Sequence, residues 1–376
     1  MRSTMQDAPL SITSILKHGT TVHHDSEVIT ATADGMRSET YAELGARAAK
    51  LANALRRLGV TGDERVATFQ WNNAEHLEAY LAIPSMGAVL HTLNIRLFPE
   101  QLTYIAEHAD DKIVIVDDSL VPLLAKLLPT FTTVEHVIVA GPDAAAADLD
   151  SLRSSGKQVH LYEDLLAAEE PTFDWVIGDE NDAAAMCYTS GTTGQPKGVV
   201  YSHRSAYLHS MAVCAGNVGG LTWTDRILPI VPMFHANAWG LGHSTVMAGA
   251  NYVMPGPDLS APAIADLMES ERVTVAAGVP TIWQGVAAEL DGRDLSALRE
   301  IACGGSAVPK SLSETYREKV GISIHQAWGM TETSPIASLA TMKSTLGEQH
   351  DPGLADVRAT AGVPVPLVDL RIADPD

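Results

Sequence analysis

The sequence predicts an α/β protein of two or three packed subdomains, in which helices flank a largely parallel sheet. Short apolar runs at residues 112–116 and 137–139 are typical of buried strands, and stretches with one apolar helical face alternate with such runs. This alternation favours βαβ units and largely parallel sheets. At 376 residues the chain is too long for one compact core, because single cores stop growing near ~250–300 residues.

The first half of the chain contains clear starts of helices and strands. Thr40 and Glu43 have the spacing of a capping box, which predicts a helix directly after them. Residues 66–69 are expected to form a short strand, followed by a helix from about residue 73 to residue 83. Pro99 can open the next helix, because its fixed φ suits the first helical turn.

A second α/β series begins near Asp182, and its strands are expected as short apolar runs. Residues 366–372 alternate in hydropathy as an antiparallel strand does. The strand candidates of the second series are residues 183–188, 227–231, 252–254, 273–276, 301–302 and 322–325.

Charge and cysteine content exclude several classes of protein. The chain has 25 basic and 46 acidic side chains, a net charge of -21, which favours solubility and argues against a nucleic-acid partner. Cys187, Cys214 and Cys303 form no CxxC pair, so neither a disulfide framework nor a zinc site is expected. No secretory signal and no apolar run of ~18 residues is found, and we expect a cytoplasmic location without a transmembrane segment.

The most informative segment, here called the phosphate loop, comprises residues 188–199, Tyr-Thr-Ser-Gly-Thr-Thr-Gly-Gln-Pro-Lys-Gly-Val. Its glycines let backbone N–H groups approach an anion, its hydroxyls add donors, and Lys197 adds a positive charge. This is the chemistry of a polyphosphate cradle. It is not a Walker A loop, because Lys197 lies between Pro196 and Gly198. A flexible surface loop is the alternative interpretation.

Two further segments contain candidate ligand-binding residues. In residues 231–240 a strand ends in His235 and Trp239, at the kind of position where α/β sheets bind ligands, although both could be ordinary core residues. In residues 303–309, Gly304 and Gly305 follow a short strand and let a flat ring lie against the backbone. Glycine turns are common, so this second signal is weak by itself.

The last informative segment comprises residues 326–333, Gln-Ala-Trp-Gly-Met-Thr-Glu-Thr. Trp328 can stack on a purine, the Thr331 hydroxyl can bind a phosphate, and the Glu332 carboxylate can bind Mg²⁺. The alternative is a turn with a solvated surface glutamate.

The four segments, in this order, resemble the adenylate-forming superfamily, which includes acyl-CoA synthetases, aryl-CoA ligases, luciferases and peptide-synthetase adenylation domains. The resemblance covers nearly the whole chain. It implies the superfamily's N-terminal domain, with two sheets flanked by helices in the layer order αβαβα and an incomplete β-barrel subdomain. It implies a first α/β subdomain over residues 1–180, a second over 181–340 with the nucleotide site, and the start of a barrel-like subdomain over 341–376.

The resemblance also assigns roles to residues. It implies catalytic roles for Thr189, Lys197, His235 and Glu332, and Mg²⁺ binding by Thr189 and Glu332. The acid substrate would contact His235, Trp239, Gly304 and Ala307. The nucleotide would contact Thr189, Ser190, Gly191, Thr192, Thr193, Gly194, Lys197, Gly304, Gly305, Ser306, Gln326, Ala327, Trp328, Gly329, Met330 and Thr331.

The implied reaction has two steps. A carboxylic acid and ATP form acyl-AMP and pyrophosphate, and the thiol of coenzyme A then displaces AMP. Trp239 favours an aliphatic acid, a medium- or long-chain fatty acid or a related acid. Two alternatives stay open: an acyl-AMP ligase acting on a carrier protein, and a nucleotide-binding fragment without full activity. A homodimer is possible.

The superfamily's ribose-binding Tyr-x-Thr-Gly-Asp-like motif, its hinge and its C-terminal lysine are not found in these 376 residues. We therefore expect the chain to represent an N-terminal portion without the mobile C-terminal domain.

Overall fold

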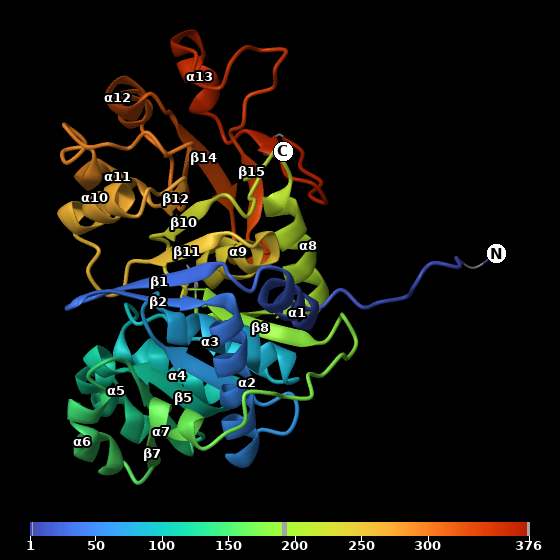
Figure 1. Cartoon of the computed structure of the whole chain (residues 1–376), viewed down its shortest axis with the longest axis vertical. Helices are drawn as coiled ribbons and strands as arrows, with labels where there is room; N and C mark the ends of the chain where they lie inside the picture. The colour runs from blue at the N-terminus through green and yellow to red at the C-terminus, as the bar shows by residue number, and fades with distance from the viewer. Residues whose placement is uncertain (2, 190–193, 374–376) are drawn as a thin grey trace. The chain divides into compact units, whose positions relative to one another are not determined.

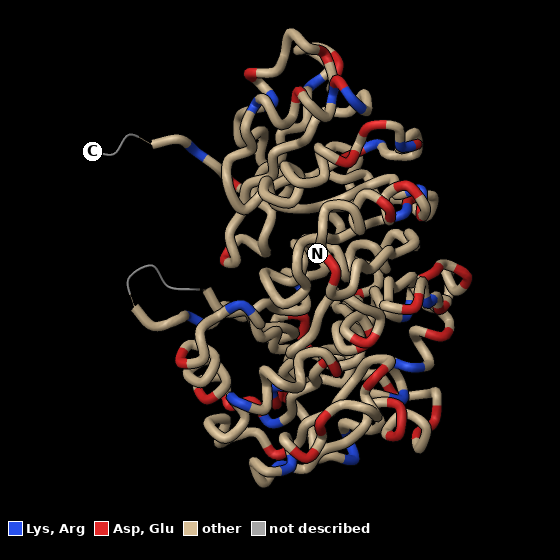
Figure 2. The backbone as a smooth tube through the Cα atoms, turned by 90° about the vertical axis from the view of Figure 1, so that its left-hand side faces the viewer, with Lys and Arg blue, Asp and Glu red and all other residues tan. Residues whose placement is uncertain are grey.

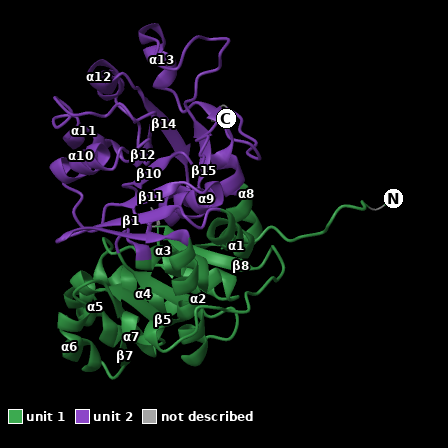
Figure 3. Cartoon of the chain, in the orientation of Figure 1, with its two compact units in different colours: residues 1–22, 42–70, 75–208 green, residues 23–41, 71–74, 209–376 purple. Residues whose placement is uncertain are grey.

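The computed structural model describes residue 1 and residues 3–189 and 194–373. The chain divides into two compact units, each formed by separate stretches of sequence (Figure 3). Unit 1 comprises Met1–Val22, Ala42–Gln70 and Glu75–Leu208, and unit 2 comprises His23–Tyr41, Trp71–Ala74 and His209–Asp376. The three expected subdomains over 1–180, 181–340 and 341–376 stay a prediction.

The sheet of unit 1 has seven strands among the described residues, in the order β7-β6-β5-β3-β4-β8-β9. All neighbours pair in parallel except β8 and β9, which are antiparallel. The inner strands are buried on both faces, which explains their continuous apolar runs. The bounds are β3 Arg65–Phe69, β4 Val89–Thr92, β5 Asp111–Asp117, β6 His136–Ala140, β7 Gln158–Leu161, β8 Ala183–Thr189 and β9 Lys197–Ser202.

Helices alternate with the strands of unit 1, as the sequence predicts. The capping-box helix is α2, and the helix that Pro99 opens is α4. The bounds are α1 Ile12–Val22, α2 Tyr41–Arg57, α3 Ala74–Ser85, α4 Pro99–Ala109, α5 Val121–Leu127, α6 Leu149–Arg153 and α7 Tyr162–Ala167; α8 spans His203–Cys214.

The sheet of unit 2 has nine strands in the described part of the chain, in the order β16-β15-β14-β13-β12-β10-β11-β1-β2. The run from β14 to β1 is parallel, and β2, β15 and β16 pair antiparallel at the two ends. Figure 1 shows the early strand β1 beside β11. The bounds are β1 Glu27–Thr32, β2 Gly35–Thr40, β10 Arg226–Pro229, β11 Asn251–Met254, β12 Val275–Gly278, β13 Glu300–Cys303, β14 Ile324–Gly329, β15 Ile336–Leu339 and β16 Val363–Pro364.

Helices of unit 2 bury large aromatic side chains beneath its sheet. Trp283 and Tyr316 are fully buried, their rings meet edge to face at 6.0 Å, and the Tyr316 hydroxyl donates to the Trp283 carbonyl at 2.8 Å. The bounds are α9 Leu241–Ala248, α10 Ala261–Ser270, α11 Pro280–Val286, α12 Lys310–Val320 and α13 Ala355–Arg358. Two sheets flanked by helices are therefore confirmed.

The strand expected over residues 366–372 is wrong. These residues carry no strand, and the short strand β16 precedes them at Val363–Pro364. Leu367 has a left-handed φ of 73° in a turn, and the Val368 N–H donates to the Val365 carbonyl at 3.2 Å. The alternating pattern therefore belongs to a turn and an exposed segment, because hydropathy alternation alone does not supply a pairing partner.

Acidic and basic positions are interspersed along both units, with acidic positions in excess (Figure 2). Most arginines lie beside carboxylates, as in the 2.7 Å pair between Arg47 and the fully buried Glu78. A helix with the length and hydropathy for crossing a membrane is not found in the described part of the chain.

Candidate functional site

The phosphate loop lies between the two antiparallel strands of unit 1. Thr189 ends β8, Lys197 begins β9, and the two residues are direct cross-strand partners. The preceding pair is Tyr188 and Gly198. Four predicted phosphate ligands lie outside the described residues, namely Ser190, Gly191, Thr192 and Thr193. The hairpin therefore places one predicted hydroxyl ligand directly opposite the predicted lysine ligand.

Lys197 is exposed, and among the described residues no carboxylate pairs with its ammonium group. Other lysines of the chain do have such partners: Lys112, Lys310 and Lys319 lie 2.6–2.9 Å from aspartate oxygens. An unpaired ammonium in a chain of net charge -21 is available to an anionic ligand. Gly194, in the same loop, is exposed as well.

The other three motif segments all belong to unit 2, where they follow β10, β13 and β14. These strands run parallel, with β12 between β10 and β13. Their carboxyl ends therefore lie at the same edge of the sheet, which is the edge where α/β proteins bind ligands. The sequence predicted each segment separately, and the sheet topology explains why they belong together.

The segment after β10 turns through a left-handed conformation. Residues 236–239 have φ values between 45° and 56°, and none of them is a glycine. Each such residue costs roughly 1–2 kcal/mol, so surrounding packing must hold the turn. The turn, Ala236–Gly240, places Trp239 partly buried, while His235 before it is exposed.

Trp239 packs against the glycine segment that follows β13. A Cβ atom added to Gly304 would lie 3.1 Å from Trp239 Cη2 and 2.9 Å from the Ala327 carbonyl oxygen. Glycine is therefore required at residue 304 by both an indole and a strand backbone. Gly305 has a left-handed φ of 83°, and Ser306 and Ala307 beyond it are exposed.

A side-chain hydrogen bond links the glycine segment to the end of β14. The Val308 N–H donates to Gln326 Oε1 at 2.9 Å, so Gln326 acts in the structure as a bridge between neighbouring segments. Trp328 is 41% exposed, which leaves its indole accessible to a planar ligand. At Gly329 a side chain would collide with the Pro335 carbonyl oxygen, which explains the glycine there. Met330 beyond it is exposed.

The short turn Thr331–Thr333 contains the candidate metal ligand. Thr331 is buried, whereas Glu332 is exposed and has no hydrogen-bond or ion-pair partner among the described residues. Such a carboxylate supplies the hard oxygen ligand that Mg²⁺ prefers. Within the described residues, no group of three or more His, Cys, Asp or Glu side chains could hold a metal by itself. An ion bound by Glu332 would therefore need further oxygen ligands, such as phosphates.

Sequence analysis missed His209, which is buried in unit 2. Its ring occupies the space that a side chain at Gly240 would need, and its Nε2 atom accepts the Ile336 N–H at 3.4 Å. Burial, with a smaller contribution from nearby His243, lowers the pKa of His209 to about 4, so the ring is neutral near pH 7. His209 thus supports the backbone beside Trp239 and the strand that follows Glu332. No sequence motif indicates this contact.

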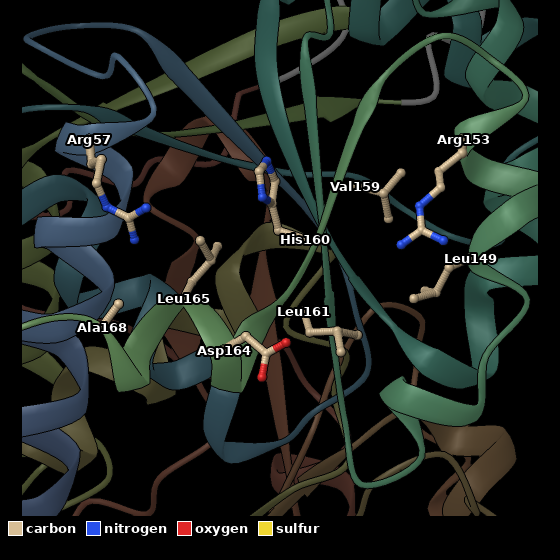
Figure 4. Close-up of a pocket in the computed structure, with 9 residues that line it drawn as sticks. All are labelled: Arg57, Leu149, Arg153, Val159, His160, Leu161, Asp164, Leu165 and Ala168. Carbon is tan, nitrogen blue, oxygen red and sulfur yellow. The ribbon is translucent and has the colours of Figure 1, made fainter.

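A hollow of about 300 Å³ lies in unit 1 at the edge strand β7, and it contains none of the predicted site residues (Figure 4). Two arginines that line the hollow already have carboxylate partners. Arg57 Nε donates to Glu169 at 2.7 Å, and Arg153 Nη1 donates to Asp150 at 3.0 Å. Both arginines are about half exposed. We assign it no role in the site.

Unit 1 contains a hairpin around a loop rich in hydroxyl residues and glycine, and unit 2 contains three segments with ligand-type residues at one edge of its sheet. These features define a class of nucleotide-handling enzymes. The model of the AMP-binding enzyme family matches residues 16–376. The chain belongs to this family, and the predicted resemblance to adenylate-forming enzymes is confirmed.

Named relatives are CoA ligases. The chain is 41% identical over 384 residues to a 3-methylmercaptopropionyl-CoA ligase of Ruegeria lacuscaerulensis, covering 100% of this chain and 69% of the relative. It is 41% identical over 375 residues to a long-chain-fatty-acid–CoA ligase of Thermus thermophilus, covering 99% of this chain and 66% of the relative. The chain thus spans about two thirds of these relatives.

A solved structure confirms the fold. The crystal structure of the anthranilate CoA ligase AuaEII in complex with anthranoyl-AMP matches with a TM-score of 0.82 at 22% identity, covering 100% of this chain and 67% of that chain. At this identity the match establishes the fold alone.

Proposed function

We propose that the chain belongs to an ATP-dependent acyl-CoA synthetase, an acid–thiol ligase that activates an aliphatic carboxylic acid as acyl-AMP and transfers the acyl group to coenzyme A. The observation that carries the proposal is the pairing of Thr189 with Lys197 at the base of the phosphate loop. A hydroxyl donor and an unpaired ammonium at adjacent positions suit a polyphosphate. The named relatives, all CoA ligases, support coenzyme A as the acceptor.

We assign the nucleotide contacts residue by residue. Lys197 contacts the phosphates, Trp328 stacks on the adenine and the Thr331 hydroxyl binds the α-phosphate. The four loop residues Ser190, Gly191, Thr192 and Thr193 stay predicted phosphate ligands. Gly304, Gly305 and Ser306 border the adenine, where the absence of side chains at the two glycines permits close approach.

Glu332, with Thr189, would hold Mg²⁺. When bound, Mg²⁺ would neutralise part of the phosphate charge. The protein's own contribution to adenylation is position and charge: the substrate carboxylate must lie in line with the α-phosphorus, and Lys197 offsets the negative charge of the phosphates. The carboxylate oxygen forms the new bond to phosphorus, and pyrophosphate leaves with the bonding electrons.

The acid would lie beside His235, Trp239, Gly304 and Ala307. The indole of Trp239 is a broad apolar surface beside Gly304, so an aliphatic acyl chain suits it. A medium- or long-chain fatty acid is the proposed substrate class. The names of the two relatives span a short thioether acid and long-chain acids at the same 41% identity, so overall similarity does not set the chain length.

A single product assay tests this function. The protein is incubated with Mg·ATP, coenzyme A and, in turn, acetate, 3-methylmercaptopropionate, octanoate, palmitate and ferulate, and products are identified by mass spectrometry. The expected products are AMP, pyrophosphate and the CoA thioester of octanoate or palmitate. A parallel reaction with a phosphopantetheinylated carrier protein in place of coenzyme A tests the other acceptor. Acyl transfer to the carrier protein alone would overturn the CoA assignment.

Binding is measured separately by calorimetry with ATP and with a non-hydrolysable acyl-AMP analogue. Binding of either ligand supports the nucleotide site even where turnover is slow. A folded protein that binds neither ligand and forms no acyl-AMP would overturn the proposed function.

A further inference from the structure

A buried acid–imidazole pair lies in the sheet of unit 1, on the strands β4 and β5. His91, on β4, and Asp111, at the start of β5, are both 0% exposed. His91 Nδ1 lies 2.8 Å and 2.9 Å from the two carboxylate oxygens of Asp111. Moving a carboxylate from water into the protein interior costs free energy. A buried pair of this kind is therefore kept only where the packing of the folded protein compensates for that cost.

The imidazole ring also meets the strand that leads into the loop. His91 and Tyr188 have ring centroids 5.2 Å apart at a tilt of 47°. The Tyr188 hydroxyl is 2.7 Å from His108 Nδ1 at the end of α4. Burial raises the pKa of Tyr188 to about 12, with the Asp111 carboxylate adding to the effect, so the hydroxyl stays protonated. Tyr188 is therefore held by a ring on one element and by a hydrogen bond on another.

Tyr188 in turn supports the second strand of the hairpin. Gly198 is its cross-strand partner, and a Cβ atom added there would lie 3.1 Å from Tyr188 Cζ. The tyrosine ring thus covers the glycine, an arrangement that stabilises glycine within strands. The next cross-strand pair is Thr189 and Lys197. One aromatic ring consequently connects the buried pair to both ends of the phosphate loop.

We infer that His91, oriented by Asp111, is a positioning residue that sets Tyr188 and, through it, the Thr189–Lys197 pair for nucleotide binding. The inference rests on the proposed function, because it names the support of the same nucleotide site. Among the described residues His91 Nε2 has no hydrogen-bond partner, and the contacts that define the ring's position are those of Nδ1 with Asp111 and of the ring with Tyr188. The proposed role of the pair is therefore one of orientation.

The test is a double-mutant cycle read out as ATP affinity. His91→Asn keeps an amide donor near the position of Nδ1 and removes the ring that meets Tyr188. We expect it to weaken Mg·ATP binding about tenfold, below the ~10²-fold loss that a misplacement of 1 Å can cause in catalysis. Affinity for octanoate should stay within about twofold. In a Tyr188→Leu background, His91→Asn should cause no further loss, because residues that act through one another are not additive.

His76→Asn is the matched control. His76 is another 0%-exposed histidine of unit 1, and its Nε2 lies 2.9 Å from the Thr68 hydroxyl. It should lower thermal stability while leaving the ratio of ATP to octanoate affinity unchanged. If His91→Asn does not fold, Gly198→Ala takes its place in the double-mutant cycle with Tyr188→Leu. Gly198 is exposed, and the added methyl group would displace the Tyr188 ring.

Losses of ATP affinity that multiply in the double variant would overturn the inference while the proposed function stands. An equal loss of ATP affinity in His76→Asn would do the same. A wild-type protein that binds neither ATP nor the acyl-AMP analogue overturns the proposed function instead. Recovery of ATP affinity in His91→Gln to within about twofold of wild type would also count against a role for the ring, because glutamine has no aromatic face.

Discussion

Thr189 and Lys197 are direct cross-strand partners at the loop end of the antiparallel β8–β9 pair. The hairpin thereby places a hydroxyl and an ammonium group at the two bases of one glycine-rich loop. Because β8 also pairs in parallel with β4, the rigid sheet of unit 1 supports the hairpin. The following predictions test the consequences of this arrangement and of the segments in unit 2.

Lys197→Ala should weaken Mg·ATP binding roughly tenfold, because one charge-assisted contact of ~1.5 kcal/mol is lost. Calorimetry measures the affinity, and ATP–pyrophosphate exchange at limiting ATP measures the consequence for adenylation. Lys126→Ala, which removes an exposed lysine of α5 far along the sequence from the loop, is the control. Unchanged ATP affinity in Lys197→Ala would exclude a contact with the phosphates.

Glu332→Gln should raise the Mg²⁺ concentration needed for half-maximal acyl-AMP formation, with an increase of roughly tenfold expected if one carboxylate ligand is lost. The Mg²⁺ titration is performed at fixed total ATP. Glu318→Gln, an exposed glutamate of α12, is the control. A titration curve that superimposes on that of the wild-type protein would rule out Glu332 as a metal ligand.

Trp239→Ala should change the preference among acids of different chain length by roughly tenfold and leave ATP affinity within about twofold, because the indole is an apolar surface beside Gly304. The ratio of kcat/KM for octanoate and palmitate is the measurement. Trp223→Ala, at a tryptophan that is 70% exposed, is the control. A fall in ATP affinity with an unchanged acid preference would instead identify Trp239 as a structural residue.

Gly304→Ala should impair the protein more severely, because the added methyl group meets both the Trp239 indole and the Ala327 backbone carbonyl. The indole can shift, whereas the strand backbone cannot. Combining Gly304→Ala with Trp239→Ala should therefore recover only part of the lost acyl-AMP formation. Full recovery in the double variant would show that the indole alone causes the restriction.

Stability should fall in acid because His209 is buried in its neutral form. The pKa of the folded state, about 4, lies below the ordinary value of 6.5, so the unfolded chain binds the proton first. The stabilisation is complete above about pH 6.5 and is lost as the pH falls towards 4, by at most ~3 kcal/mol at 1.36 kcal/mol per pH unit.

Urea unfolding at pH 7 and pH 5 measures this dependence. His209→Gln can still accept the Ile336 N–H and cannot titrate, so its stability difference between the two pH values should be smaller than that of the wild-type protein. His24→Gln, at an exposed histidine, should retain the wild-type difference. Equal pH dependence in all three proteins would show that His209 is not the titrating group.

Local patterns were sufficient to predict much of the fold. The capping-box spacing, Pro99 and the apolar runs correctly located α2, α4, β3, β5 and β6, because capping, fixed φ and burial act over a few neighbouring residues. The strand expected over residues 183–188 is likewise found, as β8. The expected strand over 366–372 failed because pairing needs a partner that a hydropathy pattern does not specify.

By itself, then, the sequence determined which residue types gather in each motif and which family the chain resembles. Only the tertiary structure decided which distant segments meet: β1 joins β11 across more than 200 residues, Trp239 covers Gly304, His209 fills the space at Gly240, and His91 reaches Tyr188. The spacing of residue types along the chain indicates backbone conformation and burial only over a few neighbouring residues. Contacts between distant segments depend on the order of strands in a sheet and on the volumes that side chains leave to one another.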